Sequence, residues 1–122
     1  MANPNTLSAT SIVETTILAA LTTAQVSILS NASGSGLLLK LNELVLSNIT
    51  TSSVTALVKV YSAAALGGTG YQLLPSTTIP ANTAIAGVSG DNPQNLVEDR
   101  SIGASCSVAA AVEVTGSAKI LT

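Results

Sequence analysis

The sequence predicts an all-β protein, an antiparallel β-sandwich of jelly-roll type with about eight strands. Three observations indicate this class: apolar and polar residues alternate over short segments, the segments recur roughly every 8–12 residues, and Gly, Pro, Asn and Ser separate them. A chain of 122 residues amounts to one domain. We therefore expect a single sandwich over residues 11–122, preceded by an irregular N-terminal arm over residues 1–10, which are polar and aperiodic.

The first two strands are expected over residues 12–21 and 24–29. The first segment is rich in Ile, Val, Thr and Leu, and the adjacent β-branched Thr15 and Thr16 favour extended chain over helix. The second segment alternates apolar and polar residues. Residues 31–36 are rich in Gly and Ser and form a loop by composition.

The next two strands carry the clearest patterns. Residues 37–48 give the longest strand, in which the apolar alternation slips by one position at Glu43, as a β-bulge or a bend would cause. After a polar turn, residues 54–61 alternate regularly. Four residues of that strand are predicted to face the core: Val54, Ala56, Val58 and Val60.

The second half of the chain predicts shorter strands and more turns. Loops are expected at residues 67–70 and 89–95, and turns at residues 79–82 and 98–100. Strands are expected between and after them, over residues 71–74, 83–88, 101–108 and 111–121, the last two pairing as a hairpin.

The residue types exclude most catalytic chemistry, so we expect no enzyme and no cofactor. The chain has no histidine and one cysteine, Cys106, so neither a zinc site nor an intrachain disulfide can form, and the thiol is expected in the core. The adjacent carboxylates Glu98 and Asp99 fit a charged turn beside Arg100 better than an acid/base pair. A calcium site drawing on Asp91, Asn92, Glu98 and Asp99 is the alternative that the sequence leaves open.

Charge and hydropathy limit the partners. Four scattered basic residues and two tyrosines make no nucleic-acid surface. The uncharged stretch over residues 15–39 is interrupted by polar residues and predicts no membrane span, and residues 1–10 show no targeting signal. Only 8% of residues are charged, against about a quarter in ordinary domains. Either copies of the chain or another protein cover much of the surface, or the surface is neutral and polar.

The order of several segments resembles a family. The strand-turn-strand LNELVLSNITTSSVTALVKVY (residues 41–61) is followed by TIPANTAI (residues 78–85) and NLVEDRSIGASCS (residues 95–107). This order is similar to that of small β-sandwich virion proteins of tailed bacteriophages, especially those of marine phages and cyanophages. The resemblance implies a virion structural protein that is assembled in the host cytoplasm, foremost a capsid decoration (cement) protein bound across neighbouring coat subunits.

Two alternatives stay open: a phage tail or tail-tip component, and a carbohydrate- or receptor-binding module. The expected partners are the major capsid protein, or another virion protein, and copies of the chain itself in a homo-trimer. An apolar Leu57 on an outward strand face, the neighbouring outward Tyr61 and the aperiodic arm are the features that point to such contacts. The predicted partner-binding residues are Met1, Ala2, Asn3, Pro4, Asn5, Thr6, Leu7, Leu57 and Tyr61.

Overall fold

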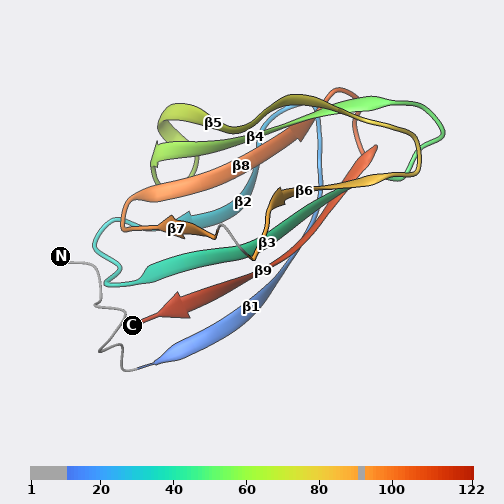
Figure 1. The fold of residues 1–122 in the computed structure, drawn as a ribbon. Coiled ribbons are helices and arrows are strands. Elements are labelled where there is room, and N and C mark those ends of the chain that lie inside the picture. Colours follow the sequence, from blue (N-terminus) through green and yellow to red (C-terminus); the bar gives the residue numbers. More distant parts are fainter. Residues whose placement is uncertain (1–10, 91–92) are drawn as a thin grey trace.

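The computed structural model describes residues 11–90 and 93–122, which form two packed antiparallel sheets without a helix (Figure 1). The all-β prediction is confirmed, with nine strands where about eight were expected. The ninth is the three-residue β7. The strands are β1 Ile12–Ala20, β2 Val26–Asn31, β3 Leu38–Asn48, β4 Val54–Ala63, β5 Gly67–Ile79, β6 Ala84–Val88, β7 Gln94–Leu96, β8 Arg100–Cys106 and β9 Val112–Leu121.

The strand order is that of a jelly roll. One sheet, here sheet A, has the order β1-β9-β3-β6 with β7 also paired to β3; the other, sheet B, has the order β2-β8-β4-β5. The pairs β1–β9, β2–β8, β3–β6 and β4–β5 are nested, as if one long antiparallel hairpin had been rolled up. The additional pairs β3–β9 and β4–β8 complete each sheet.

An aliphatic core fills the space between the sheets. Leu, Ile, Val and Ala form it because the chain has no Phe or Trp. On β4, Val54 and Val58 are buried and Val60 is half-buried against the core, which confirms the predicted inward face. Cys106 is also buried in this core, as expected, and its thiol donates to the carbonyl of Val108 at 2.8 Å.

The slip in apolar alternation at Glu43 corresponds to a real β-bulge. The register between β3 and β9 shifts between Leu41 and Glu43, so Leu41 and Leu44 can both face the core. Glu43 pairs with Ser117, and its carbonyl lies where a side chain on Gly116 would be. A glycine at position 116 is therefore required by the close approach of the bulged backbone.

Two buried asparagines hold the loops at the two ends of the sandwich. The amide of Asn48 donates to the carbonyls of Ser52, Ile79 and Pro80 at 2.8, 2.9 and 3.1 Å, while its carbonyl oxygen accepts from the backbone N–H and the hydroxyl of Thr50. This one side chain ties the β3–β4 turn to the β5–β6 turn.

Asn31 does the same at the opposite end. Its amide donates to the carbonyls of Leu37 and Leu96 at 2.8 and 2.9 Å, and its carbonyl oxygen accepts from the Ser35 hydroxyl. Asn31 and Asn48 head the Asn-x-Ser/Thr triplets of the sequence. They are 1% and 2% exposed, so their role is structural.

Three sequence expectations about the second half are wrong. Residues 67–70 begin β5 instead of forming a loop, and the strand expected at residues 71–74 is part of that longer strand. The reversal occurs one step earlier, at residues 64–66, where Ala65 and Leu66 adopt positive φ without glycine. Side chains of distant residues hold this turn: Asp99 accepts from the N–H of Ala64, Ser30 from Ala65 and Ser101 from Leu66.

The expected last hairpin is the third error. β8 pairs with β2 and β4 in sheet B, whereas β9 pairs with β1 and β3 in sheet A, so the two consecutive strands lie in opposite sheets. Residues 107–111 cross between the sheets. Alternation along the chain is the same for a hairpin and for such a crossover, because both bury one face of each strand.

Candidate interaction surface

The carboxylates and the thiol of residues 11–90 and 93–122 do not gather into a metal-binding group. Within these residues no group of three or more Cys, Asp and Glu side chains could hold a metal ion. The carboxylate of Asp99 accepts the N–H of Ala64 at 3.0 Å, and Arg100 donates to the carbonyls of Ser62 and Asp99. The side chains of the predicted charged turn therefore bind the backbone at the end of β4 and the turn that follows it. Asp91 and Asn92, part of the calcium alternative, lie outside the described residues.

Leu57 and Tyr61, two of the predicted partner-binding residues, lie on the outer face of sheet B as the alternation required. Leu57 is half-buried and contributes to a small hollow of about 170 Å³ with serine and threonine side chains of β4, β5 and β8. Tyr61 is only 9% exposed, so the expectation of an exposed tyrosine is wrong.

The burial of Tyr61 has a geometric cause. A Cβ added at Gly70 would lie 3.0 Å from its Cε1, and one added at Gly103 would lie 3.3 Å from its Cε2. The ring therefore covers two glycines on the neighbouring strands β5 and β8, and Leu66 reaches the same spot from the β4–β5 turn. Tyr61 stabilises the outer face of the sheet instead of offering a contact. The remaining predicted residues, Met1–Leu7, lie outside the described residues.

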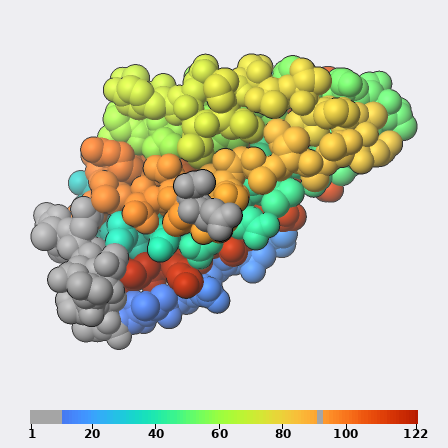
Figure 2. Space-filling model, in the orientation of Figure 1, coloured from blue at the N-terminus to red at the C-terminus, as the bar shows by residue number. Residues whose placement is uncertain are grey.

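The feature that the sequence analysis missed is strand β1, one outer strand of sheet A, which runs along the lower margin of the molecule in Figures 1 and 2. It carries apolar residues on both faces: Ile17 points into the core and Val13, on the same face, is 53% exposed, while Ile12 and Leu18, on the opposite face, are 58% and 75% exposed. Apolar residues on both faces are typical of a strand that is covered on both sides. The apolar residues on both faces of residues 12–18 were the sequence signal that could have indicated this surface.

Among residues 11–90 and 93–122, no strand pairs with the outer backbone edge of β1. Leu21 donates to the carbonyl of Val112, and Thr122 donates to the carbonyl of Ser11, at the two ends of an uninterrupted β1–β9 register. Bonded pairs alternate in an antiparallel ladder. The odd-numbered residues of β1 therefore bond to β9, and the even-numbered ones point their N–H and C=O groups outward. These outward residues are Ile12, Glu14, Thr16, Leu18 and Ala20.

The other sheet edges are protected in ways that β1 is not. β2 has six residues and a register shift, β6 has five and a register shift, and β7 has three. β5 is long, but its pairing with β4 shifts three times and it contains Pro75. Short length, bulges and proline are the devices that prevent edge pairing. β1 keeps nine consecutive pairs with β9 and carries one charged residue, Glu14.

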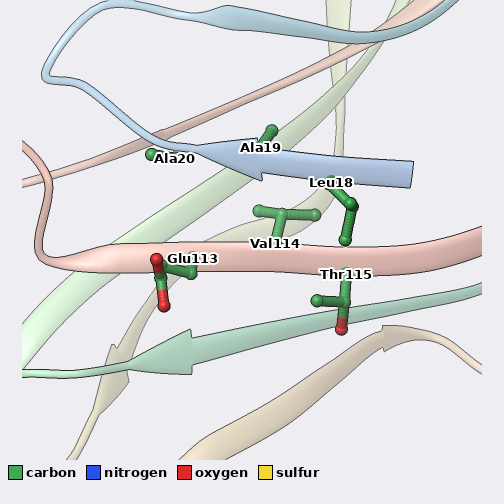
Figure 3. Close-up of a pocket in the computed structure, with 6 residues that line it drawn as sticks. All are labelled: Leu18, Ala19, Ala20, Glu113, Val114 and Thr115. Atoms are coloured by element: carbon green, nitrogen blue, oxygen red, sulfur yellow. The ribbon is translucent and has the colours of Figure 1, made fainter. Parts of the chain in front are cut away.

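An open hollow of about 450 Å³ lies at the Ala20 end of β1 (Figure 3). At this end β1 carries the small Ala19 and Ala20, whereas its opposite end carries the larger Ile12 and Val13. The two strands that frame it are β1 and β9, which contribute Leu18, Ala19, Ala20, Glu113, Val114 and Thr115. Near the strand's other end, Glu14 lies 4.0 Å from the ammonium of Lys119, so the carboxylate on the edge has a partner within the chain.

No helix among the described residues has the length and apolar character that crossing a membrane requires. No protein-family model and no curated protein matches the sequence. Among solved structures, a chain from the Bacillus endospore appendages, described as a novel family of disulfide-linked pili, is similar in fold. It is 10% identical, with a TM-score of 0.54 over 92% of this chain and 87% of that chain. At this identity the likeness concerns the fold alone.

Proposed function

We propose that this chain is a non-catalytic structural subunit, foremost a capsid decoration protein of a tailed bacteriophage that binds across neighbouring coat subunits. The observation that carries the structural role is the unprotected apolar edge of β1 on a chain with few charges. Such a protein stabilises a shell by binding only the assembled lattice, so its binding free energy adds to the stability of the shell. The virion and the coat-protein partner come from the sequence resemblance.

The test is quantitative mass spectrometry of purified particles that contain the chain. A decoration protein is expected at a copy number comparable to that of the coat protein, whereas a tail component would be present in a few copies to a few dozen. Absence from every particle fraction of an infected culture would overturn the virion proposal.

The N-terminal arm provides a second measurement of the same proposal. Deleting residues 1–10 is expected to weaken binding to particles while leaving the melting temperature of the free domain nearly unchanged. If the truncated chain binds particles as tightly as the full chain, the prediction that the arm and its residues Met1–Leu7 contact the partner is wrong.

A filament subunit is the second candidate, favoured by the fold likeness to a pilus chain. That neighbour is described as disulfide-linked, but this chain has only Cys106, which is buried. A filament of this chain would therefore rely on non-covalent contacts. Electron microscopy of concentrated purified protein separates the two candidates, because a filament subunit polymerises without a particle.

The carbohydrate-binding alternative has less support. Sugar rings stack on exposed aromatic side chains, and Tyr61 is covered. Tyr71 is 65% exposed, but the hollows described above are lined by other residues. Glycan-array binding by the purified chain would reverse this ranking.

A further inference from the structure

We infer that β1 is a self-association strand: two copies of this chain pair β1 to β1, antiparallel about a two-fold axis at Thr16, and join their A sheets into one continuous sheet. This deepens the proposed structural role by naming a second copy as a partner. It does not depend on the identity of the larger assembly.

The backbone register supports this pairing. The outward N–H and C=O groups of β1 belong to its even-numbered residues. Pairing about Thr16 places Thr16 opposite Thr16, Glu14 opposite Leu18 and Ile12 opposite Ala20 of the other copy. Each of these is an even-to-even pair, so all five outward residues of each copy find a bonding partner. A shift of the axis to Thr15 or Ile17 would leave an end residue unpaired.

Side-chain size is self-complementary in the same register. The large exposed Ile12 and Val13 of one copy come opposite Ala20 and Ala19 of the other, at the end of the strand where the open hollow lies. Two-fold symmetry repeats this contact at the other end. Leu18, at 75% exposure the most exposed large apolar side chain of the described residues, gains a cross-strand neighbour in the new pair, Glu14 of the other copy, and becomes less exposed.

Charge is compatible with this arrangement. Glu14 is the one carboxylate on the strand, and it stands opposite Leu18, away from the Glu14 of the other copy. Its own counter-ion, Lys119, lies on β9 and stays in place. A different axis, at Glu14 itself, would set two carboxylates face to face, which is unfavourable in a strand pair.

The contact is about 30 Å long for nine residues. A single strand pair of this length falls in the class of small interfaces below about 1,200 Å². We therefore expect a reversible dimer that dissociates on dilution. Sedimentation of the full chain over a concentration series is expected to move from 12.1 kDa toward twice that mass.

The register is tested with single cysteines. Oxidised Thr16→Cys is expected to form a covalent dimer, because the two Cα atoms at the axis would lie about 5.5 Å apart, within disulfide range. Leu18→Cys is the matched control, since its two copies would lie about 14 Å apart, too far for a disulfide. The wild-type chain is the second control, because its Cys106 is buried.

Opposite charges introduced at position 16 test the same register through the dimerisation affinity, without a covalent bond. Thr16→Lys and Thr16→Glu, each alone, are expected to dimerise several-fold more weakly than wild type, and their mixture about tenfold more tightly than either alone. Thr51→Lys places the same charge on an exposed turn and is expected to dimerise like wild type. A monomer at every concentration, a trimer, open-ended aggregates, or no covalent dimer from Thr16→Cys would overturn the inference. None of these assays contains a particle, so copy number in virions still decides the proposed function separately.

Discussion

Asn48 is the side chain whose loss should do most harm among the polar residues of the loops. Asn48→Ala removes the donor to the carbonyls of Ser52, Ile79 and Pro80 and the acceptor for Thr50. The carbonyl of Ile79 is in a fully buried bond and would stay without a partner, which costs about 1–3 kcal/mol. The others are partly accessible to water and cost about 0.5–1 kcal/mol each.

The expected loss is therefore at least about 3 kcal/mol in the free energy of unfolding, the sum of the lower bounds. For a domain of this size that lowers the melting temperature by roughly 10 °C or more. Circular dichroism or calorimetry measures the shift, and urea unfolding gives the free energy directly. Asn95→Ala makes the same chemical change at an exposed position and is expected to stay within about 0.5 kcal/mol of wild type.

Asn48→Asp refines this test because it keeps the shape and the acceptor for Thr50. The ionised carboxylate would face three carbonyl oxygens in a buried site, which raises the pKa of the introduced carboxyl above its value in the unfolded chain. Only the protonated form can donate to a carbonyl. The variant is thus expected to be more stable at about pH 4.5 than at about pH 7, relative to Asn48→Ala. If Asn48→Ala melts within about 2 °C of wild type, the reasoning is wrong.

Three further predictions concern the core and the β-bulge at Glu43. Val58→Asp is expected to abolish folding, because an unpaired buried charge costs several kcal/mol; a soluble variant with a normal melting curve would contradict the assigned strand face. Cys106 is expected to react with a thiol reagent only after denaturation, and rapid labelling of the native chain would place it at the surface. Gly116→Ala is expected to lose about 1–3 kcal/mol or more, because its Cβ would strike the Glu43 carbonyl; Gly90→Ala, with open space around it, is the control measured in the same urea series.

The sequence was sufficient where structure depends on local alternation. It determined the all-β class, the inward face of β4, the buried Cys106 and the bulge at Glu43, because each follows from period-2 patterning of apolar residues in one segment. Its sandwich of jelly-roll type is also confirmed. The phage resemblance and the coat-protein partner stay predictions, as does the trimer, with which the two-fold dimer inferred above competes.

Tertiary structure alone decided which strands are neighbours and which edges are free. The crossing of residues 107–111 between sheets, the glycine-free turn held by Asp99, Ser30 and Ser101, and the covering of Gly70 and Gly103 by Tyr61 all depend on residues far apart in the chain. The same is true of β1. Its residues 12–18 carry apolar side chains on both faces, which predicts covered faces, whereas only the fold shows that one edge of β1 has no neighbouring strand among the described residues. Alternation reports which face of a strand is buried, but the edge of a strand is defined by hydrogen bonds to other segments, and those leave no local pattern in the sequence.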